Sequence, residues 1–151
     1  MTPYLEPKFL ACLLLKVPGR RLAWELMKKF PPPYSLNSLH VLQTEGMLFK
    51  GLAASGNTQR AAAEGLRLWG YYRGEGVFPE LRVNWNAAFA VSLRLNREQV
   101  GPTGASTPPS PLQCLHASLA SVSGFTGFLS FEPSARFVAR SAGLEVLPER
   151  I

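Results

Sequence analysis

The chain has 151 residues, enough for one domain with a buried core, and 46% of them are hydrophobic, which excludes a chain disordered throughout. Sixteen lysines and arginines against ten acids give a net charge of +6. Every acid is a glutamate, so a Ser-His-Asp hydrolase is excluded, and eleven of the sixteen cations are arginines. Because the arginine fork binds phosphate and displaces counterions, this composition favours a polyanionic partner.

The first part of the chain, residues 1–59, is predicted to be a helical segment. Residues 6–17 form one apolar-periodic run, Pro18 and Gly19 break it, and residues 20–30 form a second amphipathic run with lysines at its end. This predicts a helical hairpin that three consecutive prolines then stop. Its basic ends suit docking on phosphate, but the same pattern also fits two core helices with solvated lysines.

The cysteines and the early apolar run bear on the cellular location. Cys12 and Cys114 are far apart, each among apolar neighbours, which fits reduced buried thiols better than a disulfide or a metal site. Charged residues interrupt the early apolar run, so it does not resemble a signal peptide, and residues 9–17 are too few to span a bilayer. We therefore expect an intracellular or organellar protein with no membrane span.

A longer helix is predicted over residues 60–73, where small and large apolar side chains recur near helical spacing. Gly65 and Gly70 each lower its stability by roughly 1 kcal/mol relative to alanine, a cost that is useful where another backbone must come close. Gly74 and Gly76 end the helix, because glycine adopts left-handed dihedral angles without penalty. Glu75 lies between these two glycines with little steric cover.

Two β-type runs follow this helix. In the second, over residues 88–95, apolar Phe89, Val91, Leu93 and Leu95 alternate with smaller or polar residues, the pattern of a strand with one buried face. The first, over residues 77–83, contains a proline and is limited to a sheet edge or a late start. Residues 84–86 are a plausible hairpin turn, so the pair predicts an antiparallel hairpin.

The remaining chain repeats a helix and a hairpin on a smaller scale. Residues 101–111 read GPTGASTPPSP, a composition typical of an exposed loop or linker. Residues 112–122 predict a helix, and residues 125–131 a strand. After a turn, Arg136 to Arg140 is predicted to return as a second strand, with both arginines on one face, where they suit phosphates or base edges.

The stretch Leu68–Gly76, reading LWGYYRGEG, resembles the nine-residue signature of the LAGLIDADG homing endonucleases, in the form that ends in Gly-Glu-Gly. FAVSLRLNREQV, residues 89–100, looks like the second strand of that family and the start of its next helix. GFLSFEPSARFVAR, residues 127–140, is similar to its second hairpin. The resemblance covers residues 60–151, with an insertion around the proline-rich segment. Arg73 stands where the family usually has an aspartate.

The resemblance implies a metal site and a mode of binding. Glu75 would hold Mg²⁺ or Mn²⁺, and the metal would activate water for cleavage of a DNA phosphodiester. A single signature implies a homodimer with one acid from each subunit. A cation at Arg73 beside the metal acid favours a descendant that only binds. Contacts to nucleic acid from the strands and their flanks are assigned to Arg82, Arg94, Arg97, Arg136 and Arg140.

The sequence thus predicts an α+β fold in which helices pack on antiparallel β-hairpins, with an N-terminal helical hairpin. Residues 60–151 would form the nucleic-acid-binding domain, and DNA or RNA would be the partner. A second hypothesis, from the same basic composition, is a structural RNA-binding subunit of a large ribonucleoprotein such as an organellar ribosome. A third is an assembly protein of a virus or a membrane complex that uses residues 125–131 as an interface.

Overall fold

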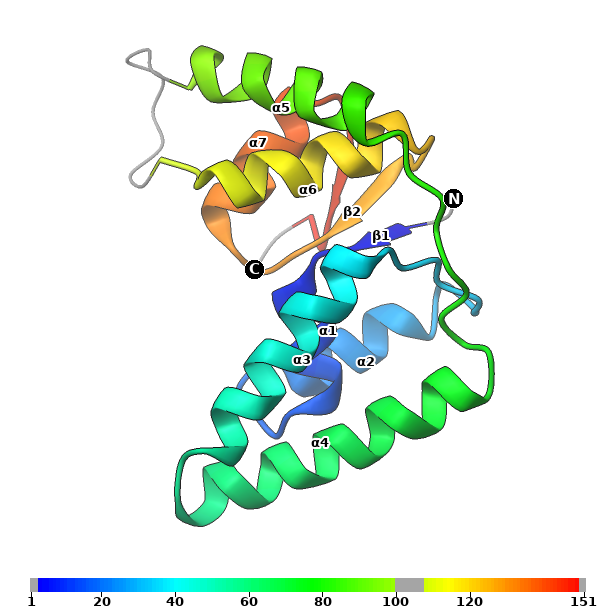
Figure 1. Cartoon of the computed structure of the whole chain (residues 1–151), viewed down its shortest axis with the longest axis vertical. Coiled ribbons are helices and arrows are strands. Elements are labelled where there is room, and N and C mark those ends of the chain that lie inside the picture. The colour runs from blue at the N-terminus through cyan, green and yellow to red at the C-terminus, as the bar shows by residue number, and fades with distance from the viewer. Residues whose placement is uncertain (1–2, 100–107, 150–151) are drawn as a thin grey trace. The chain divides into compact units, whose positions relative to one another are not determined.

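The computed structural model describes residues 3–99 and 108–149, which contain seven helices and three strands (Figure 1). The chain divides into two compact units, which are described separately. The sheet unit consists of Met1–Glu6 and Arg82–Ile151, and the helical unit consists of Pro7–Leu81. The predicted fold of helices on antiparallel hairpins is wrong, because the three strands form one small parallel sheet and helices make up most of the rest.

The sheet unit is built around three short parallel strands. Their order in the sheet is β1-β2-β3, and the register places Tyr4 beside Phe128 and Phe128 beside Val146. Parallel neighbours need a crossover rather than a tight turn, and α7 supplies the one between β2 and β3. The elements are β1 (Pro3–Leu5), α5 (Trp85–Glu98), α6 (Pro111–Val122), β2 (Gly127–Leu129), α7 (Pro133–Ser141) and β3 (Glu145–Leu147).

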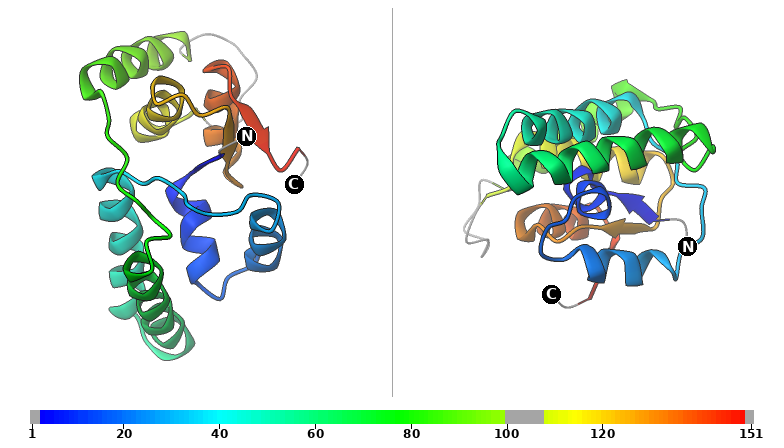
Figure 2. Two further views of the ribbon diagram at one scale, coloured as in Figure 1. Left: turned by 90° about the vertical axis from the view of Figure 1, so that its right-hand side faces the viewer. Right: turned by 90° about the horizontal axis from the view of Figure 1, so that it is seen from below.

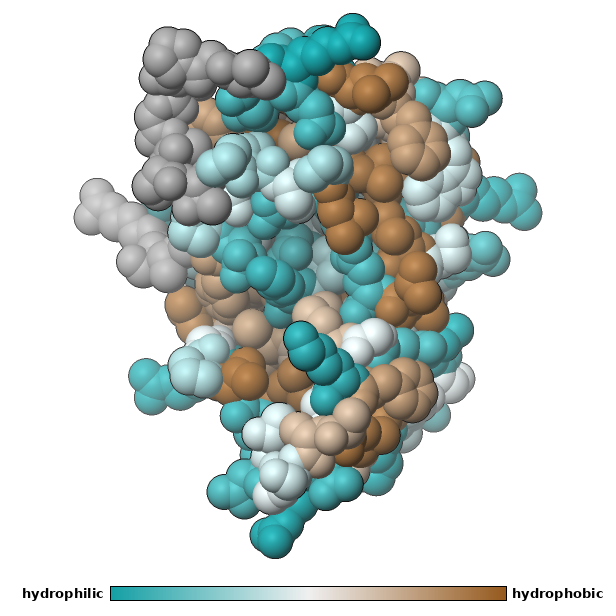
Figure 3. All heavy atoms as spheres, turned by 60° about the vertical axis from the view of Figure 1, so that its left-hand side comes forward, coloured by the Kyte–Doolittle hydropathy of each residue, from teal (hydrophilic) through white to brown (hydrophobic). Residues whose placement is uncertain are grey.

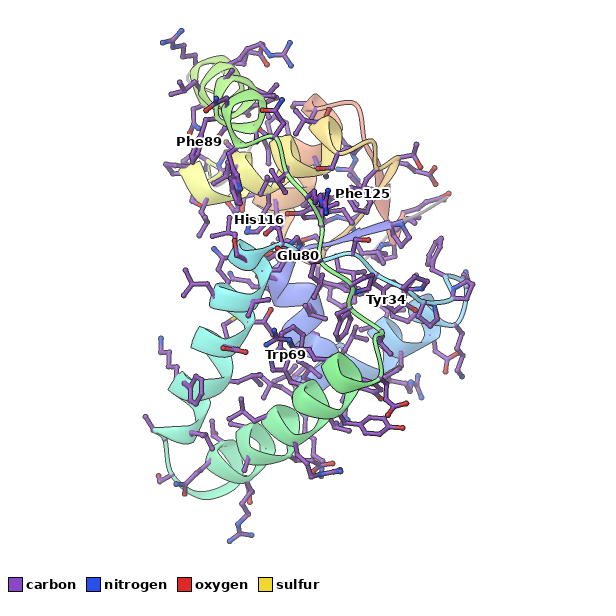
Figure 4. All side chains as sticks on the ribbon, turned by 45° about the vertical axis from the view of Figure 1, so that its right-hand side comes forward. Tyr34, Trp69, Glu80, Phe89, His116 and Phe125 are labelled. Carbon is purple, nitrogen blue, oxygen red and sulfur yellow. The ribbon has the colours of Figure 1, made fainter. Side chains whose placement is uncertain are left out.

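An aromatic cluster around Tyr4 forms the centre of this unit. The Tyr4 ring stacks on Phe128 at 5.5 Å and meets the edge of Phe125 at 5.4 Å. Its hydroxyl lies 2.7 Å from His116 Nδ1, so a polar tip inside the core has a partner. Figure 4 shows His116 and Phe125 beside β1. His116 is therefore a core histidine that fixes the sheet against α6.

The first correction concerns residues 88–95, which are predicted to be a strand but lie in helix α5. The apolar face expected to be buried is exposed, with Phe89 at 52% and Leu93 at 58% of their accessible surface. Apolar residues also reach the surface on the face drawn in Figure 3. Small side chains let α5 lie close against α6, and the buried residues of α5 are Ala88, Ser92 and Leu95.

The other predicted strands are corrected in part. Residues 77–83 form no strand, and only Glu80 pairs, in an isolated parallel bridge with Leu36. In the second predicted hairpin, β2 forms within residues 125–131, but the returning strand is helix α7. Pro133 at the first position of α7 favours a helix start, because its fixed φ suits the helix and its missing N–H is not needed there.

The helical unit contains four helices, and α1 contacts each of the other three. Helices α3 and α4 form an antiparallel hairpin, which the two views of Figure 2 show side by side. The prediction of one helix over residues 60–73 is confirmed, and so is the N-terminal helical hairpin. The four helices are α1 (Pro7–Leu14), α2 (Arg20–Met27), α3 (Ser38–Leu52) and α4 (Gly56–Gly74).

Close approach of α4 to its neighbours depends on Gly65. A Cβ atom at this position would lie 2.9 Å from Leu48 Cδ2 on α3 and 3.1 Å from the backbone oxygen of Leu14 on α1. At Gly70, five residues further along α4, an added Cβ atom would have nothing within 4 Å. The expectation that a helix glycine permits a close backbone approach therefore holds at Gly65 and not at Gly70.

Two further expectations concern the cysteines and the membrane. Neither Cys12 nor Cys114 forms a disulfide; Cys12 is half-buried and Cys114 is buried. Burial raises the pKa of the Cys114 thiol, which disfavours its reactive thiolate. In the described part of the chain, no helix combines the length and the apolar content needed to cross a bilayer. Most of the predicted loop at 101–111 lies outside the described residues, which resume at Pro108.

Candidate functional site

Glu75, the predicted metal ligand, is the C-cap residue of α4 and is exposed. It forms no ion pair with the described residues. Arg73 does not pair with it, because the Arg73 Nη1 atom donates to Glu45 Oε1 at 3.0 Å, where Trp69 Nε1 also donates at 2.9 Å. Within the described ranges, no three His, Cys, Asp or Glu side chains gather around a metal position. A metal at Glu75 would thus need ligands from elsewhere, such as phosphate.

The predicted nucleic-acid contacts divide into two groups. Arg82, Arg97 and Arg140 are exposed and form no ion pair with the described residues. Arg94 lies on the exposed side of α5, where its Nε atom is 3.7 Å from Glu98 Oε1. These four side chains are available to a polyanion at the surface of the sheet unit.

Arg136 differs from the other predicted contacts because only 4% of its surface is exposed. Its guanidinium donates to the backbone oxygen of Ser130 at 2.8 Å and to that of Pro148, so it joins the ends of β2 and β3. Burial lowers the pKa of Arg136, and Arg140 nearby adds to this effect. The two arginines share no strand face, because both lie on α7, where one is buried and the other exposed.

Exposed cations without an acidic partner outnumber exposed acids without a cationic one. In residues 3–99 and 108–149, four exposed glutamates form no ion pair: Glu75, Glu80, Glu145 and Glu149. Eight exposed cations form none: Arg21, Lys29, Lys50, Arg60, Arg67, Arg82, Arg97 and Arg140. The excess of unpaired positive charge is therefore a property of the folded surface as well as of the composition.

Part of this charge forms a stripe along α4. Arg60 and Arg67 are seven residues apart, which places them on one side of the helix at a rise of about 10.5 Å. Ala63 lies between them and is exposed, so only a small side chain separates the two cations on this side of the helix. We call Arg60, Ala63 and Arg67 the α4 stripe. A backbone of phosphates can approach such a surface without steric obstruction.

Two glutamates that sequence reasoning missed lie where adjacent parallel strands end. Glu6 follows β1 directly, and Glu132 comes three residues after β2. Ser130 connects them, since its hydroxyl donates to Glu6 Oε2 at 3.5 Å and accepts from the Glu132 backbone N–H at 3.0 Å. Ligands of parallel α/β sheets commonly bind outside the carboxyl ends of the strands. We call this group the carboxyl edge.

The carboxyl edge has the composition of a weak site for a hard cation. Glu6 is only 5% exposed, so its carboxyl group lies in a largely dry environment. Mg²⁺ commonly binds through one or two carboxylates and completes its shell with waters and substrate phosphates. Glu6 and Glu132 are the two glutamates at this edge, and their carboxylates would be the ligands of such a site. The signal in the sequence was an acid at the end of each short apolar run, PYL and GFLSF.

Comparison of the chain with family models, with curated proteins and with solved structures gave no match in any of the three.

Proposed function

We propose that this protein binds nucleic acid through contacts to the phosphate backbone. The observation that carries the proposal is the excess of exposed, unpaired cations, eight against four glutamates in the described residues. Six of the eight are arginines, whose planar fork can bind two phosphate oxygens at once. Arg82, Arg97 and Arg140, which the sequence assigned to this role, are among them.

Binding of this kind is expected to be strongly salt-dependent and largely independent of base sequence. Each phosphate that a cation neutralises releases counterions, so the logarithm of affinity falls with the logarithm of salt concentration. Fluorescence anisotropy with duplex DNA, structured RNA and single strands, between low and physiological salt, measures this directly. Absence of binding at low salt, or binding that salt does not weaken, would reject the proposal. A preference for structured RNA would support a role as a ribonucleoprotein subunit.

Reversing the charge of the α4 stripe tests where the phosphates lie. We expect the double variant Arg60→Glu, Arg67→Glu to weaken binding at low salt by about 100-fold. The slope of log affinity against log salt concentration should fall by about two, one for each lost phosphate contact. The control is Lys16→Glu with Lys28→Glu, which changes the net charge equally. These two lysines already pair with Glu64 and Glu25, at 3.0 Å and 2.8 Å. Equal losses in both double variants would show that net charge, and not the α4 stripe, governs binding.

A second function, metal-dependent cleavage of phosphodiesters, is favoured by the carboxyl edge. Glu6 and Glu132 would hold Mg²⁺ together with a substrate phosphate. The bound metal would lower the pKa of a water, which attacks phosphorus while the bond to the leaving oxygen breaks. Hydrolysis in this form needs no other reactant.

Glu132→Gln separates this cleavage from binding. If the carboxyl edge is the metal site, the variant loses Mg²⁺-dependent cleavage of a target library by at least about 100-fold and keeps its affinity, because only one metal ligand has changed. Glu75→Gln is the matched variant at the site that the sequence predicted, and we expect it to cleave as the wild type does. Loss of cleavage in Glu75→Gln alone would place the metal at the end of α4. If the wild-type protein cleaves the library no more with Mg²⁺ than with EDTA, binding is the only function that remains proposed.

A further inference from the structure

The helical unit contains a groove of about 360 Å³, which is in the size range of small-ligand sites. Its walls come from the start of α3, the end of α4 and the extended segment after α4. Backbone hydrogen bonds fix that segment, from Tyr34 N–H to the Val77 oxygen at 2.9 Å and from Leu36 N–H to the Pro79 oxygen at 3.0 Å. The residues that matter for the argument are Asn37, Ser38, Trp69, Arg73, Phe78 and Glu80.

Asn37 contributes an unpaired buried donor to the lining of the groove. The side chain is 98% buried, since only 2% of the residue is exposed, and its Oδ1 caps α3 by accepting from the N–H groups of Leu39 at 3.0 Å and His40 at 3.1 Å. The Nδ2 group of the same amide is buried and has no hydrogen-bond partner in the described residues. Buried donors are almost always paired, so an unpaired amide in the wall of a groove calls for an acceptor from a ligand.

The groove also has the electrostatics of a phosphate site. Helix α3 has 15 residues, and its N-terminus carries partial positive charge from aligned peptide dipoles. Ser38 is exposed at the first turn and offers a hydroxyl. Arg73 lines the same groove from α4, and only its Nη1 atom donates to Glu45, so the rest of its fork can donate to a phosphate oxygen.

Two aromatic rings, those of Trp69 and Phe78, also line the groove, and Arg73 lies over the Trp69 ring at 5.5 Å from its centroid. The rings of Trp69 and Phe78 are 5.2 Å apart and inclined by 37°. Figure 4 shows Trp69 and Tyr34 on the two sides of the extended chain that carries Glu80. Because Trp69 is only 3% exposed, the half-buried Phe78 ring is the one that offers a surface to a flat ligand ring. Glu80 is exposed in the same lining, where its carboxylate can accept from amino or hydroxyl groups of a ligand.

We propose that this groove binds a nucleoside monophosphate, or a phosphate ester of the same class. The phosphate lies at the start of α3 beside Arg73, the flat ring lies against Phe78, and an acceptor of the ligand takes the Asn37 amide. The proposal does not depend on the polymer binding proposed above, because a chain that ignores long nucleic acids can still bind the mononucleotide. The same chemistry occurs in a free nucleotide and in the terminal nucleotide of a strand.

Calorimetry on the full chain tests the ligand class. The probes are adenosine monophosphate, adenosine, inorganic phosphate, and short oligonucleotides with a 5′-phosphate or a 5′-hydroxyl. We expect the monophosphate to bind at least tenfold more tightly than adenosine or phosphate, since neither fragment fills both parts of the groove. A 5′-phosphorylated oligonucleotide that matches the monophosphate would identify a strand end as the source, and failure to match would identify the free nucleotide. No heat with the monophosphate at millimolar concentration would overturn the proposal, as would equal affinity for inorganic phosphate alone.

Asn37→Asp is the sharpest variant because aspartate also caps helices well. It keeps the cap acceptor and replaces the unpaired amide with a negative charge. We expect at least a tenfold loss of affinity for the monophosphate, measured at a temperature where circular dichroism shows the variant to be folded, because a buried carboxylate also lowers stability. Arg73→Gln should lose about as much, whereas Lys28→Gln, an exposed cation outside the groove that pairs with Glu25, should bind normally. Equal affinity in Asn37→Asp and the wild type would overturn the proposal.

Glu45→Gln supplies a test in the opposite direction. Glutamine keeps an oxygen to accept from Trp69 and Arg73, but it no longer neutralises the Arg73 charge. We expect this variant to bind the monophosphate severalfold more tightly, a gain that a purely structural role for Glu45 would not produce. Unchanged or weaker binding would show that Arg73 does not face the phosphate. Polymer binding tested through Arg60 and Arg67 uses other residues, so the failure of one proposal is distinguishable from the failure of the other.

Discussion

Replacing Gly65 with valine is expected to destabilise the helical unit by about 3 kcal/mol, at the upper end of the cost of overpacking. The new Cβ would lie 2.9 Å from Leu48 Cδ2 and 3.1 Å from the backbone oxygen of Leu14. A side chain can rotate away from such a contact, but the carbonyl belongs to α1 and can move only with that helix. For a unit of this size the melting temperature should fall by about 15 °C, measured by circular dichroism.

Gly70→Ala is the matched control, because it changes a glycine of the same helix where nothing lies within 4 Å. Alanine there removes only the conformational freedom of the unfolded glycine, so the variant should gain up to about 1 kcal/mol. Opposite signs at the two positions would show that close packing, and not glycine itself, decides the result. A tolerated valine at position 65 would contradict the packing of α4 on α1.

Replacing Arg136 with methionine is expected to cost the sheet unit about 3 kcal/mol. Methionine fills similar volume, but it donates nothing, so the backbone oxygens of Ser130 and Pro148 lose a charged donor inside the protein. Urea denaturation measures the loss. Arg140→Met, one turn further along α7 and exposed, should change stability by no more than about 0.5 kcal/mol.

The pair also tests the function that the sequence assigned to both arginines. Nucleic-acid affinity should fall in Arg140→Met, which removes an exposed cation. It should stay unchanged in Arg136→Met under conditions where that variant remains folded. Normal stability of Arg136→Met together with weaker binding would contradict its place in the structure and restore the predicted contact.

The strand predicted at residues 88–95 shows how a period-two pattern can mislead. The sequence pattern placed the large apolar residues inside, but α5 buries Ala88 and Ser92 and exposes Phe89 and Leu93. The close contact with α6 selects for small side chains, and hydrophobicity alone does not report that requirement. A local signal was present, because Asn84 is a good cap and its Oδ1 accepts from the Ala87 N–H at 3.1 Å.

Helices with clear ends could be predicted from the sequence, while the sheet could not. Pro18, Gly19 and the glycines around Glu75 mark ends that the structure confirms. The parallel pairing of Pro3–Leu5 with Gly127–Leu129 joins segments that no local pattern connects. The prediction of a helix that ends at the glycines around Glu75 is confirmed, but the strands predicted next are absent from the described residues that follow, where α5 forms.

The long separation of the paired segments along the sequence also explains why the carboxyl edge was missed. Glu6 was assigned to the start of a helix, and Glu132 to the vicinity of a turn between two antiparallel strands. Each acid is unremarkable by itself, and only the parallel register brings Ser130 between them. The groove beside Asn37 has the same character, because its walls come from segments separated by 30 or more residues, as Ser38 and Trp69 are.

The split of the sheet unit along the chain has a consequence for synthesis. Its first strand is synthesised well before its partner at 127–129, because the whole of Pro7–Leu81 lies between them in the chain. Until β2 is made, the backbone groups of residues 3–5 have no sheet to join, while Pro7–Leu81 is already complete and makes its contacts within itself. The order of translation therefore favours a helical unit that matures early, with the sheet closing as the final, long-range step of assembly.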